Sequence, residues 1–231
     1  MRILGIESSS LVASVAVVTD GVLTAEYTVN FKKTHSQTLL PMIDEMGKLL
    51  ELDLNTVDAI AVSGGPGSFT GLRIGSATAK GLGLALQKPL IHVPTVDAMA
   101  YNLYGCGGII CPIMDARRNQ VYTGLYSFDR EFQVLKPQCA MDMRELVEEL
   151  NQLGRPVVFL GDGVPVYEKI IEETMTVPFS FAPAHCNRQR AASVAALGAV
   201  YYEKGQTETA AEHMPDYLRK PQAEREREGL E

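Results

Sequence analysis

Residues 63–75 read Ser-Gly-Gly-Pro-Gly-Ser-Phe-Thr-Gly-Leu-Arg-Ile-Gly and join an expected strand over residues 58–63 to an expected helix over residues 70–86. A glycine-rich turn at a helix N-terminus presents backbone N–H groups and the positive end of the helix dipole, which can hold phosphate groups. The segment fits neither common phosphate motif, because Gly71 is followed by Leu72-Arg73 and no Gly-x-Gly-x-x-Gly is present. A tight turn that needs glycine for positive φ is the alternative interpretation.

Small residues recur at steps of four along the expected helix, at Gly71, Gly75, Ala79 and Gly83. This spacing places all four on one side of the helix. Because a glycine inside a helix costs about 1 kcal/mol relative to alanine, the stripe requires an offsetting gain from the close packing of another backbone. That backbone belongs either to the same domain or to a protein partner.

Composition argues against a dedicated nucleic-acid binder. The 231 residues carry a formal net charge of −7, whereas such proteins normally carry a basic stripe that neutralises phosphates. Local basic groups that could attract a nucleic acid include Arg117, Arg118, Arg188 and Arg190, and ordinary solvated arginines are the favoured interpretation. No Cys-x-x-Cys, no signal-peptide pattern at residues 1–7 and no apolar run of about 18 residues is present. We expect a cytoplasmic protein that makes no use of the membrane.

Hydrophobic patterning predicts an α/β protein with two related halves. Residues 12–18 and 22–29 form a predicted hairpin with the turn signal Asp20-Gly21, and Thr34 and Gln37 have capping-box spacing. The first half is predicted to run β-β-β-α-β-α-β-α, with strands at 3–6, 12–18, 22–29, 58–63 and 89–93 and helices at 34–50, 70–86 and 95–104. The second half has predicted strands at 109–114, 120–128 and 156–160 and helices at 141–150, 164–174 and 188–204. We therefore expect lobes at 1–105 and 106–210, followed by a charged segment at 211–231.

Six segments of the chain, given below in sequence order, together resemble the TsaB (YeaZ) family. The resemblance spans nearly the whole chain, and the joint occurrence of the segments is specific although each alone is weak. The segments are Ile6-Glu7-Ser8-Ser9, His35-Ser36-Gln37-Thr38-Leu39-Leu40-Pro41, residues 64–75, Ala79-Lys80-Gly81-Leu82, residues 115–122 and Pro215-Asp216-Tyr217-Leu218-Arg219.

The resemblance implies an ASKHA fold, which is the actin, sugar-kinase and heat-shock-chaperone architecture of two ribonuclease H-like lobes. It also implies a non-catalytic partner of TsaD, the transferase that places threonylcarbamoyl on the adenosine beside the tRNA anticodon. A TsaE-like ATPase would complete the machine, the chain alone would form a homodimer, and tRNA would be reached only through the complex. Because a fold alone does not define a function, an ATP-dependent small-molecule kinase or acyltransferase of the same fold stays as the alternative.

The residues needed for catalysis are missing from the expected positions. By the resemblance, Thr95 and Met99 stand where TsaD-like proteins carry a His-x-x-x-His metal pair, and Asp97 is interpreted as an ordinary acid in the first turn of a helix. The four histidines show no ligand spacing, and Ser68 sits one place too early for the Gly-x-Ser-x-Gly motif of serine hydrolases. We predict no catalytic residue, no metal site, no cofactor and no metallopeptidase activity.

A nucleotide site is predicted only in a vestigial or partner-dependent form. In ASKHA proteins the phosphate loops follow the first strand of each half, which corresponds here to residues 7–10 and 115–117, and neither contains the usual Asp-x-Gly. Serine hydroxyls can hold an anion, but without the glycine the backbone cannot approach a phosphate as closely. The predicted residues are Glu7, Ser8, Ser9, Gly67 and Ser68.

The predicted functional surface is a pair of helices. The helix that follows Thr34 carries apolar residues over more than one stripe, whereas an outer helix needs only one stripe to meet its own core. The small-residue stripe of residues 71–83 is expected to lie beside it, and packing under another element of the same chain is the alternative. The predicted partner and dimer interface consists of His35, Leu39, Met42, Ile43, Met46, Gly71, Arg73, Gly75, Ala79 and Gly83.

Overall fold

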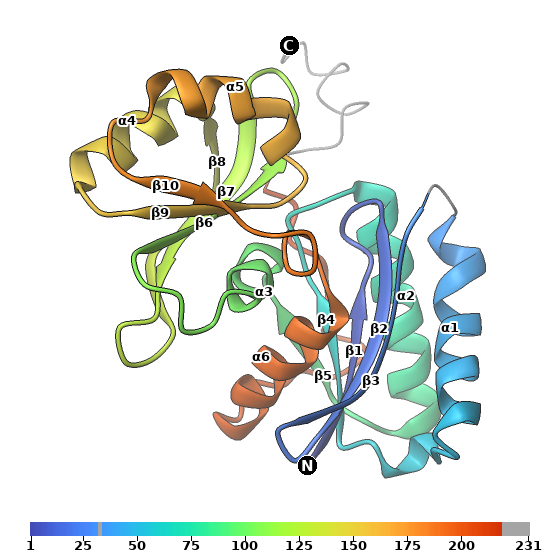
Figure 1. The fold of residues 1–231 in the computed structure, drawn as a ribbon. Coiled ribbons are helices and arrows are strands. Elements are labelled where there is room, and N and C mark those ends of the chain that lie inside the picture. Colours follow the sequence, from blue (N-terminus) through green and yellow to red (C-terminus); the bar gives the residue numbers. More distant parts are fainter. Residues whose placement is uncertain (32–33, 219–231) are drawn as a thin grey trace.

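The computed structural model describes residues 1–31 and 34–218 as two lobes, each built on a five-stranded sheet (Figure 1). In each sheet three consecutive strands form an antiparallel meander, and the next two strands run parallel to the first of them. The first sheet has the order β3-β2-β1-β4-β5, with β1 (Arg2–Glu7), β2 (Val12–Thr19), β3 (Val22–Asn30), β4 (Ala59–Ser63) and β5 (Leu90–Val93). The second has the order β10-β9-β6-β7-β8, with β6 (Ile109–Asp115), β7 (Gln120–Ser127), β8 (Gln133–Asp142), β9 (Val157–Leu160) and β10 (Phe179–Phe181).

Outer helices cover one face of each sheet. In the first lobe, α1 (His35–Leu49) and α2 (Phe69–Leu86) lie side by side on the first sheet (Figure 1). Alternate residues of a strand point to opposite faces, so Leu4 and Ile6 pack in the α1 and α2 cluster while Ile3 packs in a second cluster on the other face. In the second lobe, the outer face is covered by α4 (Met143–Leu153) and α5 (Val164–Thr174). The short helix η1 (Leu54–Thr56) precedes β4.

The two lobes exchange their remaining helices. Helix α6 (Ala191–Glu203) comes from the second half of the chain but packs on the first sheet, so closely that a Cβ at Gly5 would lie 2.5 Å from the Ala191 carbonyl oxygen. Helix α3 (Thr95–Tyr101) comes from the first half, and its Met99 packs with Tyr126 in the core of the second lobe. The expected boundary at residue 105 therefore separates the two sheets but does not separate the helices that cover them.

The segment after α6 also returns to the first lobe. Glu208 pairs with Leu90 of β5, and the Asp216 N–H donates to the Gly64 carbonyl oxygen at 2.7 Å. Lys80 Nζ of α2 donates to the His213 carbonyl oxygen at 3.0 Å. Residues 206–218, called the C-terminal segment below, thus cross the first lobe beside α2 and β5. Residues 32–33 and 219–231, which include most of the predicted charged tail and Arg219 of the family motif, lie outside the described residues.

Most predicted elements are present, and the differences are local. The Asp20-Gly21 hairpin is confirmed, with φ values of 49° and 77°. Thr34 is the N-cap residue of α1 but makes no side-chain capping bond, so the capping box is not formed. The prediction missed β8, an edge strand with mostly exposed residues in its first half, and the three-residue β10. No helix of the described chain has the length and apolar character that crossing a bilayer requires.

Candidate functional site

The small-residue stripe of α2 packs against its own lobe. A Cβ at Gly71 would lie 2.1 Å from the Ser8 carbonyl oxygen, and one at Gly75 would lie 2.2 Å from Ser8 Oγ. Ala79 is completely buried in the core cluster, and Gly83 lies against Leu90. The stripe therefore meets the turn after β1 and the edge of the sheet, which corrects the expectation that these four residues themselves contact a partner.

The predicted residues of α1 face the same core. His35, Leu39, Met42, Ile43 and Met46 are all buried in the single chain. His35 Nε2 lies 2.7 Å from the Ser10 carbonyl oxygen, which ties the start of α1 to the loop after β1. The apolar residues of α1 that exceed one stripe in the sequence are thus packed inside the lobe.

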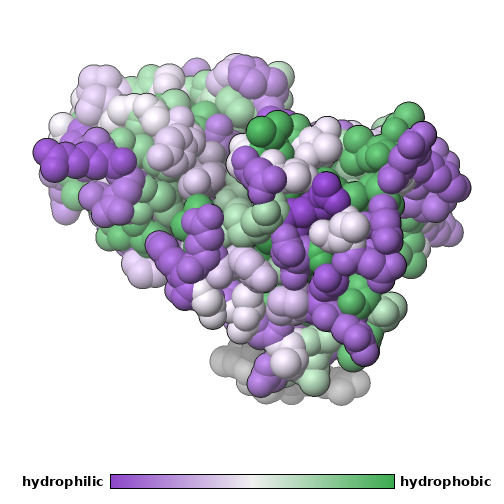
Figure 2. Space-filling model, turned by 90° about the horizontal axis from the view of Figure 1, so that it is seen from below, coloured by the Kyte–Doolittle hydropathy of each residue, from purple (hydrophilic) through white to green (hydrophobic). Residues whose placement is uncertain are grey.

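The outward faces of α1 and α2 still carry apolar and charged side chains. Leu40 and Leu49 of α1 are 53% and 84% exposed, and Leu84 of α2 is 68% exposed. Arg73, the one exposed member of the predicted interface, stacks over the Phe69 ring and donates from Nε to Tyr217 Oη at 3.3 Å. Figure 2, which views the molecule from below, shows hydrophobic residues among hydrophilic ones at the right-hand side, where α1 and α2 lie in Figure 1.

The structure brings the predicted nucleotide residues together where the turn after β1 meets the loop before α2. Glu7 is completely buried at the end of β1, its Oε1 accepts from the Ser9 N–H at 2.6 Å, and its Oε2 has no hydrogen-bond partner among the described residues. Burial raises the pKa of this carboxyl group. Ser8 Oγ donates to the Gly71 carbonyl oxygen at 2.9 Å. The turn is therefore joined directly to α2.

Two backbone donors at the start of α2 are satisfied within the chain. The Ser68 N–H donates to the Ser9 carbonyl oxygen at 2.6 Å, and the Gly71 N–H donates to Ser68 Oγ at 3.3 Å. A Cβ at Gly67 would lie 2.3 Å from the same Ser9 carbonyl oxygen, so the two loops are in close contact. Helix N-termini bind phosphates through unpaired N–H groups, and this contact removes both donors and space from such a site.

On the opposite lobe, the turn after β9 holds a second shielded carboxyl group. Asp162 Oδ1 accepts from Gln189 Nε2 at 3.1 Å, and burial raises the pKa of this carboxyl group. Arg188 donates to the Gly161 carbonyl oxygen at 2.9 Å. Arg190 forms an ion pair with Glu26 of β3, so two of the four arginines singled out in the sequence are engaged in the fold, whereas Arg117 and Arg118 are exposed at the β6–β7 turn.

Asp97 differs from the expectation of an ordinary early-helix acid. Its carboxylate accepts hydrogen bonds from Tyr126 Oη of β7 at 2.7 Å and from Tyr201 Oη of α6 at 3.4 Å. Burial raises the pKa of Asp97, and burial followed by the charge of Asp97 raises the pKa of Tyr126. Thr95 Oγ1 lies 3.0 Å from Ser63 Oγ, while Met99 is buried in the core. The sequence could not predict that Tyr126 and Tyr201 bond to Asp97, because the three residues belong to elements that are far apart in the chain.

The two-lobed architecture with equivalent sheets and exchanged helices defines an ASKHA-type protein. Solved structures agree: the chain superimposes on YeaZ from Pseudomonas aeruginosa with a TM-score of 0.80 at 25% identity, covering 94% of this chain and 99% of that one. An inorganic polyphosphate/ATP-glucomannokinase from Arthrobacter matches with a TM-score of 0.52 at 11% identity, which shows a shared fold alone.

Sequence comparisons place the chain more closely. The family model for TsaD, tRNA N6-adenosine threonylcarbamoyltransferase, matches residues 25–227. The tRNA threonylcarbamoyladenosine biosynthesis protein TsaB of Bacillus subtilis is 34% identical over 97% of this chain and 96% of its own length. The protein of the same name from Haemophilus influenzae is 31% identical over 95% and 94%. The chain belongs to the TsaB (YeaZ) family, as its motifs predicted.

Proposed function

We propose that this chain is a non-catalytic subunit that binds a TsaD-like transferase and supports threonylcarbamoylation of tRNA. The names of its relatives, which match nearly end to end, support this assignment to tRNA threonylcarbamoyladenosine biosynthesis. Within the complex a TsaE-like ATPase would supply nucleotide chemistry, and tRNA would be bound through the partner. In the absence of TsaD the same surface would form a homodimer, and the whole process would take place in the cytoplasm.

The observation that carries the proposal is the pair of helices on the first lobe. Each helix buries one face in its own core and leaves apolar side chains on the other, with Leu40, Leu49 and Leu84 all more than half exposed. Paired helices with exposed apolar residues can supply half of an intermolecular helix bundle. The partner surface is therefore the outward side of α1 and α2, together with Arg73.

The non-catalytic part of the proposal is supported by the turn after β1. Ser9 and Ser68 contact each other where a phosphate would need space, and the buried Glu7 side chain adds no anion-binding group. Thr95 is hydrogen-bonded to the Gly65 N–H through Oγ1 at 3.1 Å, and Met99 is in the core. The residues around α3 thus serve packing and hydrogen bonding.

The experiment mixes the purified chain with its cognate TsaD and measures complex size by light scattering and affinity by calorimetry. Leu40→Asp and Leu84→Asp should each weaken the complex by about 2 kcal/mol, roughly 30-fold, if these residues are interface anchors. Val166→Asp is the matched control, because Val166 is 56% exposed on α5 of the other lobe. The proposal fails if the chain does not bind TsaD, or if all three variants bind equally well.

The alternative function is an ATP-dependent kinase or acyltransferase of the same ASKHA fold. It predicts that the chain binds ATP, and this can be measured. Calorimetric titration of the isolated chain with Mg-ATP should give no saturable binding, because the Ser68 and Gly71 amides are already paired. Tight binding of Mg-ATP by the chain alone would favour the enzyme over the accessory subunit.

A further inference from the structure

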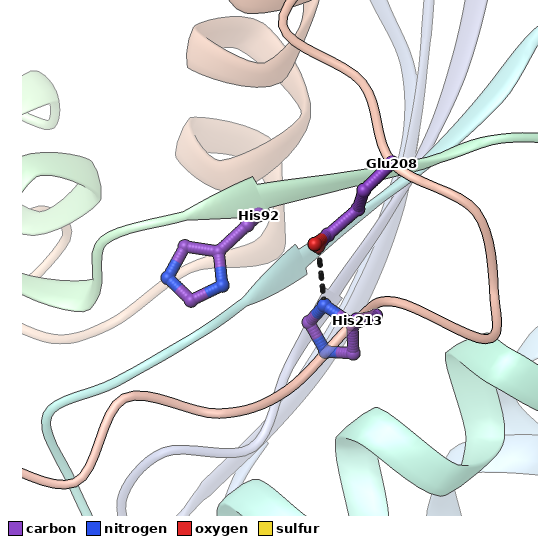
Figure 3. Close-up of side chains that lie close together, drawn as sticks. All are labelled: His92, Glu208 and His213. Atoms are coloured by element: carbon purple, nitrogen blue, oxygen red, sulfur yellow. Dashed lines mark hydrogen bonds and ion pairs between the residues drawn. The ribbon is translucent and has the colours of Figure 1, made fainter.

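Three metal-ligating side chains meet where the C-terminal segment crosses β5. His92 extends from β5, and Glu208 and His213 come from the C-terminal segment (Figure 3). One ligand atom from each residue lies within 4.8 Å of the other two. His213 Nδ1 is 2.6 Å from Glu208 Oε1, and Figure 3 shows a ring nitrogen of His92 turned towards both.

We propose that His92, Glu208 and His213 form a binding site for a divalent transition metal of the zinc type. Two imidazole nitrogens and one carboxylate oxygen are a donor set that zinc accepts in proteins, often with a fourth position open to water. Bonds of about 2.0–2.2 Å around a tetrahedral ion place neighbouring donors about 3.3–3.6 Å apart. The three donors therefore need only small side-chain movements to surround an ion.

The surroundings of His92 orient its ring for this role. His92 Nε2 lies 3.2 Å from Asp216 Oδ2, although the two atoms are not aligned as a hydrogen bond. A carboxylate that accepts the outer N–H of a histidine ligand fixes the ring and leaves its other nitrogen for the metal, and Asp216 is within reach of this role. Gly64 makes room for this ring, because a Cβ at position 64 would lie 2.2–2.5 Å from three imidazole atoms.

His213 presents a ring nitrogen to the cluster from a buried position. Its side chain is fully buried, and its Nδ1 faces Glu208 Oε1. Metals bind the neutral imidazole through a ring nitrogen. When a metal replaces the proton on Nδ1, the proton can move to Nε2, which has no hydrogen-bond partner among the described residues.

The local charges and an adjacent hollow suit a cation with one open position. Glu208 and the neighbouring Asp216 provide two carboxylates, against one positive charge from Lys80, whose Nζ bonds the His213 carbonyl oxygen at 3.0 Å. A surface pocket of about 440 Å³ is lined by His92 and Glu208 together with Pro94, Tyr201, Gln206 and Thr207. Water in this pocket can complete the coordination of the ion.

A bound ion would fasten the C-terminal segment to β5 beside α2. This inference goes beyond the proposed function and stands independently of it, since it concerns the isolated chain. It also departs from the sequence-based expectation of no metal site, which rested on Thr95, Met99 and the spacing of the histidines. His92 and His213 are too far apart in sequence to form a spacing motif, and only the return of the chain brings them together.

The test uses the full chain after treatment with a chelator and dialysis. Zinc chloride is titrated by calorimetry, and cobalt chloride by visible absorption, which reports the coordination geometry of the ion. We expect one ion per chain with micromolar or tighter affinity and the intense spectrum of four- or five-coordinate cobalt. His92→Ala and Glu208→Gln should each weaken binding by more than about tenfold, and Asp216→Asn by about tenfold through loss of ring orientation.

His185→Ala is the matched control, because His185 is exposed and lies outside the cluster. Far-UV circular dichroism of each metal-free variant checks that the fold is intact. Zinc should also slow amide hydrogen exchange in residues 206–216 of the unmodified chain but not of Glu208→Gln. The proposal is overturned if no saturable binding occurs, if His92→Ala and Glu208→Gln bind like the unmodified chain, if His185→Ala loses binding equally, or if zinc leaves the exchange of this segment unchanged.

Discussion

Adding one methyl group at Gly71 tests how closely α2 lies against the turn after β1. A Cβ there would be 2.1 Å from the Ser8 carbonyl oxygen, a backbone atom that cannot rotate away as a flexible side chain could. Gly71→Ala gains about 1 kcal/mol of helix propensity, whereas overpacking of a tight core contact costs about 1–3 kcal/mol. The net result should be a loss of up to about 2 kcal/mol in the free energy of unfolding.

Gly81→Ala is the matched comparison on the same helix. Gly81 is exposed and a Cβ there would meet nothing within 4 Å, so this variant receives the propensity gain without the clash. The difference between the two variants isolates the clash, at about 1–3 kcal/mol. For a chain of this size each kcal/mol shifts Tm by about 2–4 °C. Urea unfolding followed by circular dichroism gives the free energy of unfolding of each variant, and thermal unfolding gives its Tm. Equal stabilisation by the two substitutions would refute close contact between α2 and Ser8.

Two further predictions concern Glu7 and tRNA. Burial raises the pKa of Glu7 in the folded chain, so this group ionises at lower pH in the unfolded chain, and its contribution to stability falls as the pH rises above the ordinary glutamate pKa of about 4.3. Glu7→Gln removes this loss, and its stability relative to the unmodified chain should therefore increase with pH in urea unfolding; parallel pH profiles would contradict this. The isolated chain, with a net charge of −7, should bind no tRNA specifically at physiological salt until TsaD is added, and a submicromolar complex in a titration of labelled tRNA with the chain alone would show that it recognises tRNA directly.

Hydrophobic patterning predicted the five strands of the first sheet and three of the five strands of the second, but not the helix exchange. Leu4 and Ile6 alternate with Ile3 on opposite faces of β1, and this period of two is visible in the sequence. The sequence of α6 does not show which sheet the helix covers, because an apolar helix can pack against the apolar face of either sheet. Gly5 and Gly198, which allow α6 to approach the first sheet, acquire meaning only once that sheet is known to lie opposite.

The candidate site shows the same division between local and long-range information. The steps of four from Gly71 to Gly83 correctly predicted a close backbone contact, yet the spacing is equally compatible with a partner or with the chain's own Ser8. The five predicted nucleotide-site residues lie close together because they follow β1 and β4, and the carboxyl ends of these parallel strands meet at one edge of the sheet. That Ser68 donates to Ser9 rather than to a ligand depends on backbone geometry that no motif encodes.

Helix α3 joins the cores of the two lobes through packing and hydrogen bonds. The resemblance predicts that Thr95 and Met99 stand where TsaD-like proteins carry a metal-binding histidine pair. Here Thr95 bonds to the Gly65 N–H, Met99 fills the second core, and Asp97 between them accepts from Tyr126 and Tyr201. Since Tyr126 belongs to the second sheet and Tyr201 to the helix covering the first, this buried carboxylate joins both lobes through one side chain. Removing its oxygens would leave two tyrosine hydroxyls unpaired, so Asp97 holds the arrangement of the lobes in the place where the resemblance would otherwise put a metal.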